Sequence, residues 1–490
     1  MASERKRKSF KRILKHKIFR TRNIFSLFCI IFSIVFFIFL ILLGLLPDIY
    51  LVIVFIVLFT LNFFGISFLN AHRKFWLKVI GGIIITLCLL FDFLGLYYIV
   101  NTDNYLAEEF NQGKLYNKNS YYIIANKDKD YSENDIDGYI GTYVETSNLA
   151  DALVKLESKF SLKEKQYNDL DILLGELNTN LINFILIDQA TYEILFSISN
   201  VYHKADYSII YDFDLFTKKK VNDSSIRDSY HIFIKGLDSY GIMDYNMIVS
   251  MNRISKEILI TNIPKDYYFE VVGKQSRNDV IQYMGLYGED VDKKSIEKLL
   301  DISIDYSVVV DSKKLVSLVD YLGGVDFCSD SDFITTHALS LNSFDEGNKL
   351  YVKKGCQNLS GMEVLSVARE NNVFINGNIN KQDSCQKLIK AIFNQISKPR
   401  TLLHYNETLN NFSSLFETDI PKDVFLAMVR EVLLNGKKWT YSIRSLTGIT
   451  GIDKVHLSNM LSQVIYPEPS SVSITSKKMK EIMTLQLVED

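Results

Sequence analysis

The chain has 490 residues, which is enough for a membrane segment and two further domains, and its formal net charge is only −2. The charge is uneven, because Met1–Asn23 holds ten Lys or Arg residues against a single acid, Glu4. Long apolar runs follow this basic block at once. The block therefore favours an anionic membrane surface or an insertion signal and argues against DNA binding.

Three apolar runs come next, each about the 20 residues that a helix needs to cross a bilayer. They cover Ile24–Leu46, Ile49–Leu69 and Val79–Val100. A cleaved signal peptide would instead show one shorter apolar core followed by a small-residue cleavage site. We therefore expect three transmembrane helices.

Basic residues predict the orientation of these helices. The N-terminal block and the link Ala71–Lys78 are both positive, so we expect both in the cytoplasm. The short link Pro47–Asp48 is then a tight external turn. Three crossings place everything after about Asn101 outside the cell, which predicts a multi-pass protein of the cell membrane with its main domains outside.

One acid, Asp92, lies inside the third apolar run. An ionisable group in hydrocarbon is costly and is a functional candidate by default. Two explanations without a functional role are also open, because Asp92 lies in the outer half of the run. It would either reach the interface or stay protonated.

The five cysteines give no metal-binding pattern. Cys29 and Cys88 lie in the apolar runs, where they act as small apolar residues. Cys328, Cys356 and Cys385 are external, an odd number without CxxC or Cys/His spacing. A Cys328–Cys356 disulfide is one alternative, which the sequence leaves open.

Residues 102–227 read as an accessory α/β domain. YYIIANKD and GYIGTYV have the composition of short buried strands, and SNLADALVKLESKF follows with Ser147 as an expected helix cap. Further alternation of helix and strand predicts βαβ units and a mostly parallel sheet. The polar run Phe216–Ser229 marks the expected boundary.

Residues 230–490 read as a second, larger α/β domain. HIFIKGLDSYG, NMIVSMN, KEILITNIP and DYSVVVDS read as strands, and KKSIEKLLD, KKLVSLVDYLGG and SGMEVLSVARE read as helices. SCQKLIKAIFNQIS is expected to be another helix. The final 90 or so residues are expected to add helices and one last strand, SVSITS.

The order of several motifs resembles the LytR-CpsA-Psr family of membrane-anchored bacterial envelope proteins. These motifs are GLDSYG, DYNMIVSMN, ILITNIPKDYY, GLYGED, IDYSVVV, LVDYLGGVDF, LSGMEVLSVARE and CQKLIKAI. The three spans and the accessory domain are most similar to streptococcal capsule proteins of the CpsA type. The resemblance implies three transmembrane helices, an α/β accessory domain and an α/β main domain built as an α-β-α sandwich.

The resemblance also implies a phosphotransferase of the Gram-positive envelope. Such a protein moves capsule or wall polysaccharide from a polyprenyl pyrophosphate carrier to peptidoglycan, with a divalent metal, usually Mg²⁺. Its partners would be the lipid-linked glycan, peptidoglycan, the membrane and capsule-assembly proteins. Arginine forks suit pyrophosphate oxygens, and carboxylates suit magnesium.

Two aspartates match the metal-binding positions of the family. Asp238, in GLDSYG, falls on an acidic residue at a strand end, although an aspartate in a turn would also explain it. Asp244 falls on the aspartate of an Arg-Ser-Asp motif whose arginine is here Ile242. The resemblance therefore implies a metal role for Asp238 and Asp244, and the missing arginine weakens it for Asp244.

The implied catalytic residues are Lys265, Asp266 and Arg369. Lys265 and Asp266 fall on a Pro-Arg-Asp motif, where lysine keeps the charge but loses the bidentate fork. A solvated charge pair at a strand end is the alternative reading. Arg369 falls on the first arginine of an Arg-x-Arg pair, and Asn371 replaces the second.

Arg277, Lys381 and Gln386 are the implied substrate-binding residues. Arg277 lies near the position of a family lysine, and Gln386 matches a helix glutamine. Lys381 is the one cation in the stretch after Arg369, and Asp383 stands where an arginine would precede the helix. Most of the charge expected in this loop is therefore missing.

Three hypotheses follow. The overall match favours a glycopolymer transferase, while Ile242, Asn371 and Asp383 favour an impaired relative that binds lipid-linked glycan or regulates capsule or envelope assembly. DNA binding is the third, because Ser442–Leu461 superficially resembles a helix-turn-helix. This segment contains only Arg444 and Lys454 as cations and is expected outside the cell, so we expect no nucleic acid partner.

Overall fold

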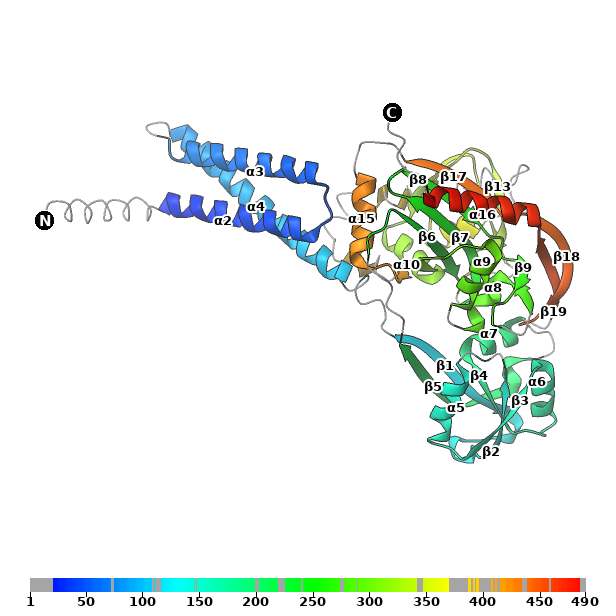
Figure 1. The fold of residues 1–490 in the computed structure, drawn as a ribbon. Coiled ribbons are helices and arrows are strands. Elements are labelled where there is room, and N and C mark those ends of the chain that lie inside the picture. The colour runs from blue at the N-terminus through cyan, green and yellow to red at the C-terminus, as the bar shows by residue number, and fades with distance from the viewer. Residues whose placement is uncertain are drawn as a thin grey trace. The chain divides into compact units, whose positions relative to one another are not determined.

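The computed structural model shows three long apolar helices followed by an α/β region with two main sheets (Figure 1). Its residues group into a membrane unit, Met1–Asn111 with Lys422–Lys438, and an outer unit, Gln112–Pro421 with Trp439–Asp490. The structure describes residues 21–484 except 72–74, 108–109, 111–115, 145, 147, 199–201, 219–224, 239–240, 274–276, 289, 342–346, 370–386, 389–390, 393, 396–406, 409, 412–414, 434–438 and 458–459.

The three predicted spans are the membrane helices α2 (Thr21–Leu43), α3 (Asp48–Leu69) and α4 (Phe75–Leu106). All three are long and apolar enough to cross a bilayer. The 32 residues of α4 rise about 48 Å, which exceeds a hydrocarbon thickness of about 30 Å. The helix continues past Val100 into the polar residues Asn101–Asn104, so its end extends beyond the predicted span.

Glycines allow these helices to pack closely. A Cβ added to Gly81 would lie 2.3 Å from the Leu69 backbone nitrogen, and one added to Gly95 would lie 2.4 Å from the Phe36 ring. Real Cβ atoms do not approach so closely, so the backbone contact of Gly81 requires glycine, and a side chain at Gly95 would displace the Phe36 ring. Small residues at such crossings are typical of helix pairs that associate within a membrane.

Asp92 lies at the centre of this bundle and is fully buried. The Ser33 hydroxyl of α2 donates to its carboxylate at 2.5 Å, and the Asn62 amide of α3 donates to Ser33 at 3.1 Å. The alternative in which Asp92 reaches the interface is therefore wrong. The carboxylate turns inward because the neighbouring helices supply polar partners.

A five-stranded sheet with strand order β3-β2-β4-β1-β5 opens the outer unit. The strands are β1 (Tyr116–Asn126), β2 (Gly138–Tyr143), β3 (Leu162–Tyr167), β4 (Phe184–Asp188) and β5 (Tyr207–Lys218). The helices are α5 (Leu149–Glu157), α6 (Leu170–Asn178) and α7 (Gln189–Ile198), with short 3₁₀ turns η2 (Lys127–Lys129), η3 (Glu133–Asp135) and η4 (Lys204–Asp206).

This accessory sheet differs from the prediction in three ways. It is mixed, because β2 runs parallel to β3 and β4 while β1 runs antiparallel to β4 and β5. The polar strand β3 was not predicted, because four of its six residues are exposed at the sheet edge. The cap of α5 is Asn148, in a left-handed conformation, and the predicted cap Ser147 lies outside the described residues.

The second sheet has six strands in the order β16-β11-β6-β7-β8-β17. Its strands are β6 (Ser229–Leu237), β7 (Met243–Asn252), β8 (Glu257–Asn262), β11 (Tyr306–Asp311), β16 (Phe416–Thr418) and β17 (Thr440–Ser445). β6 runs parallel to β11, β8 runs parallel to β17, and the other pairs are antiparallel. The four strands predicted from hydrophobic pattern all lie in this sheet.

Helices cover both faces of this sheet (Figure 1). On one face, α16 contacts β6, β7 and β8, and the buried core includes Phe233, Ile248 and Leu259. On the other, α10 packs beside β11 and against α11. The helices are α8 (Ile281–Met284), α9 (Val291–Leu300), α10 (Ser312–Tyr321), α11 (Gly361–Arg369) and α16 (Pro469–Thr484), with η5 (Gly285–Tyr287). This arrangement is the expected α-β-α sandwich.

Smaller strand pairs complete the outer unit. They are β9 (Tyr268–Glu270) with β10 (Asn278–Val280), β12 (Val325–Ser329) with β15 (Gly355–Leu359), β13 (Phe333–Ala338) with β14 (Lys349–Val352), and β18 (Gly448–Val455) with β19 (Met460–Pro467). Cys328 and Cys356 face each other across β12 and β15 and form a disulfide. The pairing that the sequence left open is therefore present.

Near the C-terminus one expectation is wrong, and a resemblance that the sequence analysis had already set aside is absent. SVSITS was expected to form a strand but lies inside α16, which begins at Pro469 and buries Thr475 and Ser476. Ser442–Leu461 is not a helix-turn-helix, because it contains the end of β17 and most of the β18–β19 hairpin. In both segments tertiary packing decides between structures that local composition leaves close in energy.

Candidate active site

Asp238 and Asp244 lie at the tight connection between β6 and β7. The Asp238 carboxylate accepts the Ile242 backbone N–H at 3.0 Å, and Gly241 adopts a left-handed φ of +80°. Asp238 therefore does stabilise a turn, as its alternative reading proposed. Asp238 and Asp244 are only 6% and 8% exposed, so both bring carboxylates into a largely dry environment.

Arg369, at the end of α11, forms a buried ion pair with Asp244. Its Nη2 lies 2.7 Å from a carboxylate oxygen of Asp244, and both side chains are 4% exposed. The guanidinium also donates to the carbonyls of Ser340 at 2.6 Å and Leu341 at 2.7 Å. Two of the Arg369 nitrogens are therefore already used within the protein.

The ion pair leaves some hydrogen-bonding groups of both Asp244 and Arg369 without a partner. Within the described part of the chain, neither Asp244 carboxylate oxygen has a partner in hydrogen-bond geometry, and nor does Nε of Arg369. The short 2.7 Å separation is thus an electrostatic contact without good directionality. Buried acceptors in this condition are suited to a further polar group or cation.

Lys265 and Asp266 lie in the loop between β8 and β9. The Gln282 side-chain amide donates to Asp266 at 3.4 Å, and the Lys265 carbonyl accepts the Gln282 backbone N–H at 3.2 Å. Burial raises the pKa of Asp266, and the positive charge of Lys265 lowers it in part. The loop is therefore held in place by α8.

Tyr283, which sequence reasoning missed, lies within the electrostatic reach of several of these acids. Burial raises the pKa of its phenol, and the charges of Asp279, Asp266 and Asp238 raise it further. Tyr283 thus connects the β6–β7 turn with the β8–β9 loop electrostatically. Its position beside GLYG in the sequence is the signal that would have pointed to it.

Asp279 is a second buried acid that the sequence analysis missed. It is fully buried, and this burial raises its pKa to about 6. The Tyr287 hydroxyl donates to it at 2.5 Å, and the Leu457 backbone N–H donates at 3.1 Å. An acid among apolar residues in NDVIQYM was the available signal.

Of the three predicted substrate-binding residues, the structure describes Arg277. The Arg277 guanidinium lies 2.5 Å from Nε2 of His456, which also contacts the Tyr143 hydroxyl at 3.2 Å. Arg277 therefore lies where the accessory sheet meets the β18–β19 hairpin. Lys381 and Gln386 lie outside the described residues.

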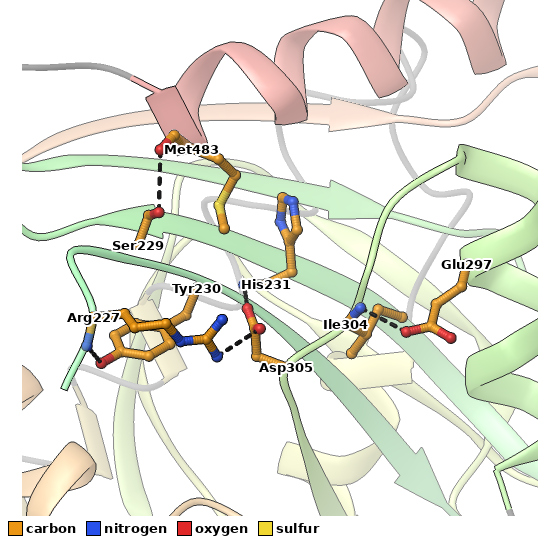
Figure 2. A network of polar contacts seen from close by, with 8 residues as sticks. All are labelled: Arg227, Ser229, Tyr230, His231, Glu297, Ile304, Asp305 and Met483. Atoms are coloured by element: carbon orange, nitrogen blue, oxygen red, sulfur yellow. Dashed lines mark hydrogen bonds and ion pairs between the residues drawn. The ribbon is translucent and has the colours of Figure 1, made fainter. Parts of the chain in front are cut away.

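Figure 2 shows a different polar network at the amino-terminal ends of β6 and β11. Asp305 accepts the His231 backbone N–H at 2.7 Å and pairs with Arg227 at 2.7 Å. The Ser229 hydroxyl donates to the Met483 carbonyl at 3.1 Å. This network ties two strands to α16 and lies at the end of β6 opposite to Asp238.

Comparison with known proteins relates this geometry to a family. The model of the LytR_cpsA_psr family matches residues 197–472, more than half of the chain. This chain belongs to the LytR_cpsA_psr family. The match includes Asp238, Asp244, Lys265, Asp266 and Arg369, and it excludes the membrane helices and most of the accessory sheet.

Curated LytR_cpsA_psr relatives include polyisoprenyl-teichoic acid–peptidoglycan teichoic acid transferases. TagU of Bacillus licheniformis is 22% identical over 231 residues, which cover 46% of this chain and 72% of TagU. TagV of Bacillus subtilis is 24% identical over 199 residues, which cover 39% of this chain and 50% of TagV. The crystal structure of B. subtilis TagV aligns with 54% of this chain and all of its own, at 20% identity and a TM-score of 0.40.

One departure from the LytR_cpsA_psr motifs now has a physical description. Ile242, where the resemblance led us to expect a motif arginine, is fully buried in the core that includes Phe233 and Ile248. An arginine at this backbone position would place a charge in an apolar core at high cost. The other replacements, Asn371 and Asp383, lie outside the described residues.

The acids of the cluster are suited to a divalent cation. Within the described residues, no group of three or more His, Cys, Asp or Glu side chains has the arrangement of a metal site. Magnesium, however, usually takes only one or two carboxylates together with phosphate oxygens and water. Asp244 offers buried carboxylate oxygens without a hydrogen-bond partner, although Arg369 already neutralises its charge, and Asp238 lies in the same turn region.

Proposed function

We propose that this protein transfers an envelope glycopolymer from a polyprenyl pyrophosphate carrier to peptidoglycan. Family membership supports this assignment, as do the relatives named as teichoic acid transferases. The observation that carries it is the buried Asp244–Arg369 pair beside the β6–β7 turn, with unsatisfied carboxylate oxygens. A polyanionic substrate and its counterion need such a desolvated, partly unpaired site.

The proposed reaction takes place outside the cell. The basic N-terminus and the basic link between α3 and α4 support a cytoplasmic position for both. The Cys328–Cys356 disulfide supports an oxidising surrounding for the outer unit, because disulfides are rare in the cytosol. Both arguments favour the same topology and are independent of each other.

The proposed roles of the residues follow from their charges. Lys265 would bind pyrophosphate oxygens, Arg369 would hold Asp244 in position, and Asp266 would accept a proton from the attacking hydroxyl. Asp244 and Asp238 would hold Mg²⁺, which when bound neutralises charge on the leaving phosphate. The raised pKa of Asp266 is appropriate for a general base.

Finer features of the proposal rest on the sequence resemblance. Capsule or wall polysaccharide is the proposed polymer, and capsule-assembly proteins of a Gram-positive envelope are the proposed partners. Three spans followed by an accessory domain support this choice, because CpsA-type proteins share that order. Arg277, Lys381 and Gln386 remain proposed contacts for the glycan or carrier.

A second candidate is a relative that binds lipid-linked glycan without turnover. Two observations favour it. Ile242 is part of the apolar core, and the Arg369 fork already binds two carbonyls and Asp244. Each missing cation would cost a few kcal/mol of transition-state stabilisation, on the order of 10²–10³ in rate.

The test uses the full-length protein in phospholipid bilayers with a polyprenyl pyrophosphate-linked glycan and peptidoglycan fragments. Bound lipid and released polyprenyl phosphate are measured together, with magnesium and with a chelator. Lys265→Met should reduce the rate at least tenfold, whereas Arg444→Ala, an exposed cation on β17, is the matched control. Lipid held without cleavage would establish the second candidate, and absence of both would reject the assignment.

A further inference from the structure

The membrane unit contains one helix from far along the chain. Helix α15 (Lys422–Leu433) lies in the sequence between β16 and β17, the two edge strands of the six-stranded sheet. By its contacts, however, it groups with Met1–Asn111 and not with the strands on either side of it. The chain thus joins the outer unit to the membrane helices at a second point, besides the link from α4 to β1 of the accessory sheet.

Three different contacts hold α15 in the membrane unit. The Lys422 ammonium lies 2.6 Å from the Asp103 carboxylate of α4. The Phe425 ring stacks on Phe110, with centroids 4.1 Å apart and an interplanar angle of 20°. The Arg430 Nε donates to the carbonyl of Gly44, just after α2, at 2.6 Å.

All of these partners lie at one end of the membrane helices. Gly44 follows the end of α2 and precedes α3, while Asp103 and Phe110 lie at and after the polar end of α4. By the topology proposed above this is the outer end of the bundle. The outer end of the bundle therefore receives three contacts from α15, which are an ion pair, an aromatic stack and a hydrogen bond to a turn.

The turn at Gly44 is shaped for this contact. Gly44 has a left-handed φ of +68°, and a Cβ there would approach the Arg430 guanidinium to 3.2 Å. A side chain at position 44 would thus be strained and would crowd the arginine. On α15, Val424, Leu426 and Met428 are all less than one-tenth exposed, so the helix is buried as well as paired.

We infer that α15 is a docking helix, a segment from within the family domain that is anchored on the outer ends of the membrane helices. Three residues separate β16 from α15, so they bridge at most about 10–14 Å. A docked α15 therefore tethers the end of β16 to the membrane unit through a short segment of chain. The docking itself does not depend on the proposed function. Its consequence, that the site stays within reach of a lipid-linked substrate, rests on the proposed function.

The first test measures hydrogen exchange in α15 of the full-length protein in bilayers. The amides of α15 are expected to exchange at least tenfold faster in a Lys422→Glu/Phe425→Ala double variant than in the wild type. Asp423→Ala, an exposed site on the same helix, should leave exchange unchanged. Amides of β6 and β7 report whether the variant remains folded.

A charge exchange isolates the ion pair. Asp103→Lys alone should speed exchange in α15, and adding Lys422→Asp should restore slow exchange. Equal exchange rates in α15 of the wild type, the double variant and both charge variants, with β6 and β7 folded, would overturn the docking inference. Restoration by the exchanged pair would support direct contact, because each single change places like charges together and only the combination restores an opposite pair.

The functional consequence is tested with two substrates. A long-chain polyprenyl pyrophosphate glycan embedded in the same bilayer should lose at least tenfold in rate in the undocked variant. A short-chain, water-soluble analogue should react at the wild-type rate. Equal loss on both substrates would refute the positioning role, whereas an inactive wild type would reject the proposed function and leave hydrogen exchange to decide the docking.

Discussion

At the scale of single residues, the same side chains of the candidate site stabilise the fold and are proposed to take part in the reaction. Arg369 binds two backbone carbonyls and Asp244, so its removal affects folding as well as any reaction. The sequence singled out both residues but not their pairing. Ile242 shows the opposite case, where a position expected to carry charge belongs to the apolar core.

We expect Arg369→Ala to destabilise the outer unit by about 3–5 kcal/mol, because it leaves Asp244 buried without its counter-charge. Arg369→Leu combined with Asp244→Leu should recover much of this loss, since no unpaired charge remains. Urea midpoints of the full-length protein in detergent, followed by near-ultraviolet circular dichroism, measure both changes. A purely catalytic Arg369 would leave these midpoints unchanged, as the control Arg444→Ala should.

Two buried groups predict opposite pH dependences of stability. Burial raises the pKa of Asp279 to about 6, so the folded protein binds this proton more tightly than the unfolded chain does. The free energy of unfolding therefore falls as the pH rises from about 4 to 6. Burial lowers the pKa of His231 to about 4, so the unfolded chain binds this proton more tightly. The free energy of unfolding therefore rises as the pH rises from about 4 to 6.5. Each effect amounts to about 3 kcal/mol, and together they should nearly cancel.

Single variants should reveal this cancellation. In Asp279→Asn the free energy of unfolding should rise from pH 4 to pH 6.5, because only the His231 effect remains. In His231→Gln it should fall over the same range. Urea midpoints at the two pH values give both slopes, and parallel slopes in the two variants would contradict the assignment.

At the scale of elements, the membrane helices form an assembly and not three separate anchors. The glycine contacts of α4 and the chain from Asn62 through Ser33 to Asp92 link all three helices. The thiol of Cys29 extends this chain by donating to Asn62 at 3.1 Å. The hydrophobic pattern predicted the three helices but gave no information on which residues face one another.

Asp92→Leu should loosen this bundle, because it removes the acceptor that orders Ser33 and Asn62. The expected cost is about 0.6–1.7 kcal/mol, as for other hydrogen bonds between membrane helices. Maleimide labelling of Cys29, which is fully buried in the wild type, should increase severalfold. Asp92→Asn, which keeps an acceptor oxygen, should label as slowly as the wild type. Fast labelling in Asp92→Asn would show that an amide does not replace the carboxyl group here.

At the scale of the whole molecule, contacts distant in sequence join elements that no local pattern connects. His456, at the tip of the β18–β19 hairpin, meets Tyr143 of the accessory sheet and Arg277 of the family domain. The two residues of the first contact are 313 positions apart. Because the Arg277 guanidinium has only donor groups, Nε2 of His456 is the acceptor of this contact.

A double-mutant cycle measures this contact. Tyr143→Phe and His456→Ala should each destabilise the outer unit, and their coupling energy should be about 0.5–1.5 kcal/mol. Tyr139→Phe, at an exposed position of the same strand, should cost nothing. A coupling energy indistinguishable from zero would mean that the hairpin does not hold the accessory sheet.

The sequence by itself determined the membrane helices, the family and the strands β6, β7, β8 and β11, because apolar runs and period-two alternation survive any tertiary arrangement. It also proposed Asp238, Asp244, Lys265, Asp266 and Arg369 as site residues, and their roles stay a prediction. Only the tertiary structure decided that Asp244 pairs with Arg369, that Asp92 turns inward, that α15 joins the membrane unit and that SVSITS is helical. These outcomes depend on which partners the fold brings within a few ångströms, and a linear pattern does not contain that information.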